Sequence, residues 1–527
     1  MDRENELLNS AIRHHRESRS DDAERICRQL LKSHPESHKA LSLLALLTAE
    51  SGNYETALSL IQKALQLSPS SAYYHNLFGH IQSQAGQIAA AELSLRRAIE
   101  FDPNLAEAYF NLGAVYQVEE KIDAATDCFR RALKLNPNNV SVLIRLGNIL
   151  LAKKNEESLI HFERAVQIDP QRADARGCLV LAHLSMAALQ SDRRETEKMF
   201  DSYRRALAIQ PDHIEAHWNL SNELLRYGNL LEGWKQYEWR WKWPQFTSRR
   251  HNFLEPIWRG APLNGARVLL HAEQGLGDTI QFVRYAPMVS EKGGEVILEV
   301  DSSLHRLLSW MPGMRQVIIA GERLPDFDIH CPLMSLPLAF GTTLETIPAS
   351  VPYIRVDLGH HAMWKKRIEG AGFNVGLVWA GNPAHTRDRR RSIALKSFAP
   401  LAQAKGVRLF SLQKGPAAEE ATQRPAGMNL IDWTSSIVDF ADTAAIIAEM
   451  DLVISVDTSV AHLAGAMGKP TWILVPWPSD WRWMLDREDS PWYPTARLFR
   501  QAETEKWEPV IEKLISEFLQ LLQKSGG

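Results

Sequence analysis

The sequence predicts an α + α/β chain, in which an all-α solenoid of helical repeats is followed by two lobes of parallel β-sheet and helices. Prolines recur at positions 35, 69, 103 and 137, which makes three successive intervals of 34 residues. From about residue 265 the pattern changes to short β-rich runs that alternate with helical stretches. Because continuous apolar strands separated by helices are typical of parallel sheets covered on both faces, we expect this half to be α/β.

Composition and charge describe an ordinary globular chain. Its 527 residues are too many for one core, and the net charge of −3 gives no field that would attract nucleic acid or an anionic membrane. The N-terminal stretch lacks the apolar core of a secretory signal, and no apolar run approaches the roughly 18 residues that span a bilayer. The four cysteines are scattered and form no CxxC pair, so neither a disulfide framework nor a zinc site is indicated. We therefore expect a cytoplasmic protein with no nucleic-acid partner and no membrane span.

The first half carries glycines in register with the prolines. Gly79, Gly113 and Gly147 each follow a proline by ten residues, and Gly52, Gly86 and Gly228 each follow one by seventeen. A small residue lets two helices approach closely, a mid-repeat glycine ends the first helix, and proline terminates the second. A single hairpin of this kind cannot bury its apolar face, so the units are expected to stack.

This period, with its placement of Gly, Ala and Pro, resembles the tetratricopeptide repeat. We expect the array to occupy residues 1–245, and the 41-residue spacing from Pro170 to Pro211 predicts seven inserted residues near 186–196. Such solenoids usually bind a protein or peptide along a concave surface. The alternative is that the array only spaces the second half or joins it into a homo-oligomer.

The second half is expected to hold two lobes, at residues 246–357 and 358–505, and a terminal helix at 506–527. The stretch 347–357, with Pro348 and Pro352, looks like the link between the lobes. Since ligands of open α/β sheets bind beyond the carboxyl ends of the strands, the site is expected between the lobes. The predicted strands are 267–271, 295–300, 375–379, 407–412, 451–456 and 471–475, with helices at 278–290 and 507–522.

The first candidate site motif follows the opening strand of the first lobe. Gly275 and Gly277 permit a tight turn and a close approach of the backbone to a ligand, and Asp278 lies where the next helix begins. A purely structural alternative is a carboxylate that caps the helix.

The second motif follows the strand at 451–456. Asp457, Thr458 and Ser459 open a helix, and exposed amides and hydroxyls at a helix N-terminus form an anion site. His462 lies four residues after Thr458, on the same helix face. A diphosphate would meet hydroxyls, amides and an imidazole there. The alternative is a capping turn with a buried histidine.

Together the two turns resemble those of the heptosyltransferase-type glycosyltransferases, which have two Rossmann-like lobes (the GT-B fold). Leu276, Gly277 and Asp278 match the family's Leu-Gly-Asp turn, and the helix-opening turn of the second lobe matches its Asp-Thr-Gly-x-x-His signature except that Ser459 replaces glycine. The two-part layout resembles that of the O-linked N-acetylglucosamine transferases and of bacterial repeat-containing glycosyltransferases, some of which modify flagellin. The asparagine ladder of the former is mostly absent, because only Asn111 and Asn219 match it.

The resemblance implies the roles of the site residues. Asp278 would be the base that takes the proton of the acceptor hydroxyl, in an inverting transfer from a nucleotide-sugar donor. The first lobe would hold the acceptor and the second the donor. No cofactor is implied beyond that co-substrate. The residues implied in donor binding are Gly275, Gly277, Asp457, Thr458, Ser459 and His462.

Three further stretches are candidates for the same site. The loop 379–392 concentrates cations after a strand and contributes Asn382 and Arg389; its alternative is a solvated basic loop. Gln413 and Lys414 also end a strand, and the lysine is placed to contact phosphate or ribose. The aromatic run 476–483 would either stack on a base or sugar or pack the edge of the lobe.

The pair Asp326 and Asp328 spells a DxD sequence, which binds metal in another class of glycosyltransferases, but here it enters a predicted strand. Since no other metal-ligand spacing is present, we expect metal-independent transfer. The preferred function is therefore glycosyl transfer to a protein recruited by the repeats. Two alternatives stay open: a binding scaffold with a degenerate transferase half, and transfer to a glycan or a lipid-linked acceptor.

Overall fold

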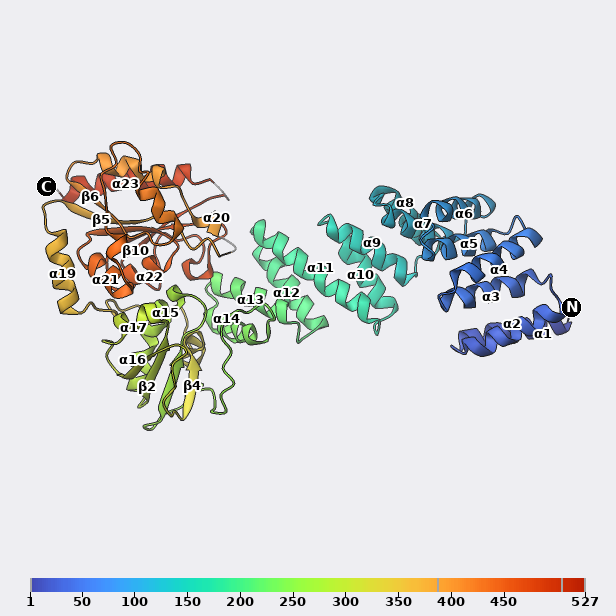
Figure 1. Cartoon of the computed structure of the whole chain (residues 1–527), viewed down its shortest axis with the longest axis horizontal. Helices are drawn as coiled ribbons and strands as arrows, with labels where there is room; N and C mark the ends of the chain where they lie inside the picture. Colours follow the sequence, from blue (N-terminus) through green and yellow to red (C-terminus); the bar gives the residue numbers. More distant parts are fainter. Residues whose placement is uncertain (1, 386–387, 504–505, 526–527) are drawn as a thin grey trace. The chain divides into compact units, whose positions relative to one another are not determined.

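The computed structural model describes residues 2–385, 388–503 and 506–525 and divides the chain into two compact units, Met1–His213 and Ile214–Gly527 (Figure 1). The first unit is all-helical, and the second contains two parallel sheets flanked by helices. The predicted α + α/β class is confirmed. Among the described residues, no helix combines the length and the apolar character needed to cross a membrane.

The first unit is a series of helical hairpins in which each helix packs against the next. Its helices are α1 (Asp2–Arg16), α2 (Ser20–Ser33), α3 (His38–Glu50), α4 (Tyr54–Leu67), α5 (Ala72–Gln84), α6 (Ile88–Phe101), α7 (Ala106–Val118), α8 (Ile122–Leu135), α9 (Val140–Ala152), α10 (Glu157–Ile168), α11 (Ala173–Asp192) and α12 (Thr196–Ile209).

Both sets of periodic glycines have the expected roles. Gly52 and Gly86 follow the ends of α3 and α5 with φ of 84° and 76°, a left-handed conformation that glycine adopts without steric cost. In the middle of α7, a Cβ on Gly113 would lie 2.7 Å from the Phe129 ring of α8. Glycine at this position therefore lets the two helices of a hairpin pack closely.

The predicted insertion lengthens one helix. Helix α11 has 20 residues, whereas α9 has 13. Seven residues correspond to about two α-helical turns, so the apolar face of α11 keeps its direction through the longer helix. The insertion therefore leaves the repeat packing intact.

The second unit begins with α13 (Ile214–Arg226), α14 (Leu230–Tyr237) and the short 3-10 helix η1 (Glu238–Lys242). The repeat period places this hairpin in the array, but it belongs to the same compact unit as the sheets. Trp234 and Tyr237 of α14 are 1% exposed, in one hydrophobic core with residues of both sheets.

The first sheet has the order β3-β2-β1-β4, with all strands parallel. Its elements are β1 (Arg267–His271), α15 (Leu276–Phe282), the 3-10 helix η2 (Val283–Tyr285), α16 (Ala286–Glu291), β2 (Glu295–Val300), α17 (Ser302–Leu308), β3 (Met314–Ile319), β4 (Ile329–Pro332), η3 (Leu333–Ser335) and α18 (Leu336–Ala339). The predicted single helix 278–290 is broken, because Pro287 is tolerated only in the first turn of a helix and α16 begins there.

The second sheet has the order β10-β9-β8-β5-β6-β7 and is also parallel. Numbered from its own first strand this is 3-2-1-4-5-6, the order of dinucleotide-binding folds. Its elements are α19 (Leu358–Ile368), β5 (Phe373–Val378), α20 (Asp388–Arg391), η4 (Leu395–Gln403), β6 (Val407–Ser411), η5 (Pro416–Ala421), β7 (Leu430–Asp432), η6 (Thr434–Ser436), α21 (Phe440–Ala448), β8 (Leu452–Val456), α22 (Ser459–Ala466), β9 (Thr471–Val475), η7 (Trp481–Trp483), β10 (Ala496–Arg500) and α23 (Glu508–Ser525).

Helices cover both faces of the second sheet. Leu514 and Phe518 of the terminal helix α23 share a core with Val375 and Leu409 of β5 and β6. On the other face, Ala461 of α22 and the alanines of α21 belong to the core that also contains the first sheet. The terminal helix is thus part of the second lobe.

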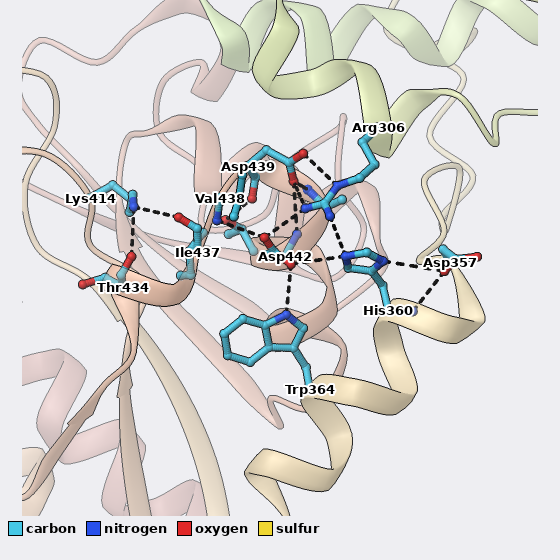
Figure 2. A network of polar contacts seen from close by, with 12 residues as sticks. Arg306, Asp357, His360, Trp364, Lys414, Thr434, Ile437, Val438, Asp439 and Asp442 are labelled. Atoms are coloured by element: carbon cyan, nitrogen blue, oxygen red, sulfur yellow. Dashed lines mark hydrogen bonds and ion pairs between the residues drawn. The ribbon is translucent and has the colours of Figure 1, made fainter.

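The two lobes meet at two junctions, α15 with α22 and α17 with α21. At the second junction Arg306 of α17 donates from Nε to Asp439 at 2.8 Å and from Nη2 to Asp442 at 2.9 Å (Figure 2). Trp364 of α19 donates to the same Asp442 carboxylate at 3.1 Å, and His360 lies beside it. Ion pairs and hydrogen bonds therefore join the two sheets on the side of α17.

Candidate active site

The two sheets present comparable ligand positions at the carboxyl ends of their strands. In each sheet the strand order reverses between the first and the fourth strand. These are β1 and β4 in the first sheet and β5 and β8 in the second. Ligands of parallel sheets bind at this reversal point. Residues 272–278 follow β1, and residues 457–459 follow β8. Both predicted motifs therefore lie where a ligand site is expected.

The turn after β1 is built around a buried ion pair and a hydrogen bond from a backbone amide to a carboxylate. Glu273 accepts from Arg240 of η1 at 2.8 and 2.7 Å, and both side chains are buried. Gly275 is the N-cap of α15, and its backbone N–H donates to Oδ2 of Asp278 at 2.7 Å. Asp278 therefore does cap the helix, as the structural alternative proposed, through only one of its two carboxylate oxygens.

The other oxygen of Asp278 pairs with Arg482, which follows β9 in the second lobe. Arg482 also donates from Nε to Gln281 at 3.0 Å and from Nη1 to Asp480 at 2.8 Å. Burial raises the pKa of Asp278 above its usual value, and the positive charge of Arg482 opposes that rise. One arginine thus serves two carboxylates, and one of them is the predicted base.

The turn after β8 opens a helix whose first amides no side chain caps. The first amides of an α-helix have no partner within the helix, and the Thr458 side chain, at the N-cap of α22, does not cap them. Its hydroxyl bonds instead to that of Ser455 at 3.0 Å. Ser459 begins the helix and is half-buried. This end of α22 combines amides without a side-chain cap with the positive end of the helix dipole.

Asp457 introduces a carboxylate into the same turn. Burial, followed by the neighbouring charge of Asp480, raises the pKa of Asp457 to about 6, against the opposing charge of Arg391. Arg391 donates from Nη1 to the Asp457 carbonyl oxygen at 2.9 Å and from Nε to Asp388 at 3.0 Å. A cation is therefore fixed at the reversal point between β5 and β8.

His462 is buried, with 5% of its surface exposed. Its Nδ1 bonds to the Tyr493 hydroxyl at 2.8 Å, and its ring stacks on Trp483 with centroids 5.1 Å apart. Burial, reinforced by Arg482, lowers the pKa of His462 to about 3, so the imidazole is neutral. A Cβ on Gly277 would lie 2.9 Å from the His462 ring. These surroundings are those of a histidine packed at the junction of the lobes.

The other predicted donor residues differ in their surroundings. Gln413 is buried, and its amide bonds at 2.8 to 3.0 Å to the backbone of Trp379, Ala380 and Lys414, so all its groups are used within the protein. Lys414 donates to the carbonyl oxygens of Thr434 and Ile437 at 2.9 and 3.0 Å (Figure 2). These contacts hold the loop after β6 against the segment that follows β7.

The basic loop after β5 is more exposed to solvent than Gln413. Asn382 is exposed and accepts from the Ala384 amide at 3.0 Å in a local turn, and Arg389 is exposed on α20. Thr386 and Arg387, which belong to the predicted basic stretch, lie outside the described residues. The structure thus brings Arg391, rather than Arg389, into contact with the turn after β8.

Sequence reasoning missed Arg482, Asp480 and Arg391 as site residues. Arg482 and Asp480 lie in the aromatic run 476–483, where Trp481 and Trp483 are 3% and 0% exposed and pack inside the unit. The available signal is a charged Asp-Trp-Arg sequence in the loop that follows a strand, because a buried arginine between aromatic residues needs a carboxylate partner.

Both carboxylates of the DxD pair face Arg267. Asp328 accepts from its side chain at 2.7 Å, and Asp326, which is 94% exposed, lies 3.9 Å from the same guanidinium. Within the described ranges, no group of three or more His, Cys, Asp or Glu side chains is arranged to hold a metal ion.

The protein-family models that match this chain also separate its repeat half from its sheet-containing half. Residues 396–474, which include the turn after β8, match the model of glycosyltransferase family 9 (heptosyltransferase). Residues 8–72, 79–117 and 106–139 match tetratricopeptide repeat models, and residues 143–213 match the model of the plant-specific mitochondrial import receptor subunit TOM20.

Among curated proteins, the chain is similar to Protein FlbA of Caulobacter vibrioides, with 24% identity over 381 residues. That match covers 68% of this chain and 63% of FlbA, so the chain spans less than two thirds of the relative's length. Among solved structures, the thermophilic TPR protein TTC0263 of Thermus thermophilus is 20% identical with a TM-score of 0.31 and covers 34% of this chain and 99% of that one. The pilF protein of Pseudomonas aeruginosa is 18% identical with a TM-score of 0.34, covering 41% and 96%.

Proposed function

We propose that this chain, which joins tetratricopeptide repeats to a region of the glycosyltransferase family 9 type, transfers a sugar from a nucleotide-sugar donor to a protein acceptor as a GT-B enzyme. The observation that carries the proposal is the contact between the two predicted turns: Gly277 lies against His462 and Ser459, next to Asp278. The match to the glycosyltransferase family 9 model includes the second of these turns.

Asp278 is the proposed general base. A base must be ionised before it takes a proton from the acceptor hydroxyl, and the ion pair with Arg482 favours the ionised form. Burial works in the other direction and raises its pKa toward the range in which a carboxylate is an effective base. The hydroxyl would then attack the anomeric carbon, the bond to the donor diphosphate would break, and the configuration would invert.

The donor diphosphate is proposed to bind at the N-terminus of α22. The amides at the start of its first turn and the fixed guanidinium of Arg391 are suited to an anion. Because negative charge grows on the leaving diphosphate as the sugar departs, donors held in place beforehand stabilise the transition state. Transfer without a metal ion is part of the same proposal.

The repeats are proposed to recruit the acceptor protein. Stacked helical hairpins present an extended surface of the kind that binds proteins and peptides. The competing candidate is a binding scaffold with an inactive transferase region. It is favoured by the internal bonds of Gln413 and Lys414 and by the neutral, buried His462.

The decisive experiment screens the purified chain by calorimetry against UDP-, GDP-, ADP- and CMP-sugars, then follows transfer to co-expressed candidate proteins by intact mass. Asp278→Asn is expected to lower kcat by about 10²- to 10⁴-fold while donor affinity is retained. Asp326→Asn, at an exposed aspartate of the same lobe, is the matched control and should transfer normally.

Four results would count against the proposal. Binding of no donor in the panel favours the scaffold, and full transfer by Asp278→Asn removes the proposed base. Loss of transfer after treatment with a chelator, restored by a divalent metal, contradicts metal independence. Retention of configuration in the product contradicts direct displacement.

A further inference from the structure

The hairpin α13–α14 is built into the transferase unit. The Trp234 ring of α14 packs edge-on against Phe282 of the first lobe at 5.8 Å and against Trp481 of the second lobe at 5.2 Å. Tyr237, at the end of α14, accepts from Gln274 in the turn after β1 at 2.7 Å. One hairpin of repeat type therefore contacts both lobes and the turn that carries Asp278.

The polar face of α13 carries a buried ion pair close to this contact. Arg226 donates from Nη1 to Glu223 at 3.0 and 3.1 Å, and the two side chains are only 11% and 10% exposed. The Nε of Arg226 is buried and has no hydrogen-bond partner within the part of the chain that the structure describes. Glu223 therefore leaves part of the guanidinium charge available to other groups.

Helix α13 packs against η7, the segment that contains Arg482. Asp480, the N-cap of η7, lies near enough to Arg226 to feel its charge: burial pushes the pKa of Asp480 up, but Arg482 and, more weakly, Arg226 hold it below its usual value. Charges of alternating sign thus run from α13 to the turn after β1, through Arg226, Asp480, Arg482 and Asp278.

We propose that Arg226 is a positioning residue for Asp278, acting through Asp480 and Arg482, so that the last helical hairpin forms part of the transferase site. This inference rests on the proposed function in that Asp278 is the base. Arg482 is shared between two carboxylates. With Arg226 in place, Asp480 feels a second positive charge, weaker than that of Arg482, and Arg482 remains with Asp278. Without Arg226, Asp480 interacts more strongly with Arg482, and Asp278 loses part of the positive charge that keeps it ionised.

Three other titratable groups that face this chain of charges are neutral or negative. Tyr237 on α14 is fully buried, which raises its pKa far above its usual value and keeps it neutral. His462 on α22, against Gly277, is neutral because burial lowers its pKa. The negative charges of Asp457 and Asp480 repel each other, and the charge of Arg391 opposes the rise in the pKa of Asp457. Tyr237, His462 and Asp457 therefore supply no positive charge to Asp480. The cations that lower its pKa are Arg482 and Arg226.

The test measures the ionisation of Asp278 directly in the full chain without substrate. Aspartate labelled with ¹³C at the carboxyl carbon is titrated by NMR, and the Asp278→Asn spectrum assigns the signal. In Arg226→Met and Arg226→Gln we expect the acid dissociation constant of Asp278 to fall at least about threefold. Arg226→Lys, which keeps the charge, should titrate like the wild type. Lys235→Met, which removes an exposed cation from the same hairpin, is the matched control and should also be unchanged.

The outcomes separate this inference from the proposed function, because the titration needs no turnover. An unchanged Asp278 titration in folded Arg226→Gln overturns the positioning role even if the chain is an active transferase. A shifted titration in a chain that turns over no donor leaves the coupling standing and removes the catalytic role. Arg226→Met and Arg226→Gln could lower the melting temperature equally while Arg226→Lys fails to restore the wild-type titration. In that case the arginine is structural only, and the inference is wrong.

Discussion

Asp278 and Arg482 form an ion pair between the two lobes, although 204 residues separate them in the chain. The carboxylate caps the first helix of one sheet, and the guanidinium follows the fifth strand of the other. The pair links the ionisation of the proposed base to the contact between the lobes.

Replacing Arg482 with Met should move the acidic limb of the pH–rate profile to higher pH by about one unit or more, because an opposite charge at this range lowers a carboxyl pKa by that amount. The rate at low pH falls correspondingly, while the plateau above the limb is affected less. Arg482→Lys should keep most of the wild-type profile. Arg487→Met, which breaks an exposed pair with Asp489 in the same loop, provides the control. An unmoved limb in Arg482→Met would show that Asp278 does not titrate in the rate.

Asp457 should make donor binding depend on pH. With its pKa raised to about 6, the side chain is largely ionised above that value and repels a diphosphate, and it becomes neutral below it. Calorimetry with an intact nucleotide sugar should therefore give a several-fold lower Kd at about pH 5.5 than at about pH 7.5. The intact donor is chosen because its diphosphate does not change charge in this range. Asp457→Asn should bind equally well at both pH values, and a pH dependence that survives this substitution would assign it to another group.

The same raised pKa has a consequence for stability. Because the folded-state pKa of Asp457 exceeds that of the unfolded chain, its contribution is present in full below about pH 4 and is lost as the pH rises through about 6. Asp457→Asn lacks this contribution, so the difference in melting temperature between the wild type and Asp457→Asn should shift in favour of the wild type as the pH falls through this window.

Gly277→Ala should destabilise the junction between the lobes. The added Cβ would lie 2.9 Å from the His462 ring and 3.5 Å from the Ser459 Cα. Overpacking of this kind costs about 1–3 kcal/mol in the free energy of unfolding. The loss should shrink in a His462→Ala background, where the ring is gone. Gly177→Ala in α11 is the control, because its Cβ would meet no atom within 4 Å; there we expect no loss. Thermal denaturation of the four variants measures the coupling.

One repeat position offers a stabilising substitution. Glu120 occupies the place that Gly86 holds one period earlier, and it adopts a left-handed conformation with φ of 58°. This conformation is strained for a residue with a Cβ, so Glu120→Gly should stabilise the α7–α8 hairpin by about 0.5–1 kcal/mol. Hydrogen exchange of the amides of α7 and α8 should slow accordingly. Gly86→Ala should act in the opposite sense on α5 and α6, and faster exchange in Glu120→Gly would contradict the assignment of strain.

The sequence predicted the central strands of both sheets with their bounds, indicated β4 only as the strand that Asp326 and Asp328 enter, and missed β3, β7 and β10. All four of these less well predicted strands lie at sheet edges. An edge strand has one neighbour and buries less of its surface, so it lacks the continuous apolar run that identifies a central strand. The exposed middle of β3, at Arg315 and Gln316, illustrates this. The candidate site was located by sequence for the same reason, because its two turns follow central strands.

What the sequence by itself determined is local. The 34-residue period, the glycines that end the first helix of a hairpin and the two polar turns after apolar strands are properties of neighbouring residues, and their conformations depend on those residues. The tertiary structure alone decided which distant charges meet. Arg482 pairs with Asp278, and the hairpin α13–α14 joins the transferase unit through Trp234, Phe282 and Trp481. A buried charge or an indole ring must find a partner, but the sequence around it does not specify which one, because the partner is selected by how the sheets and helices pack.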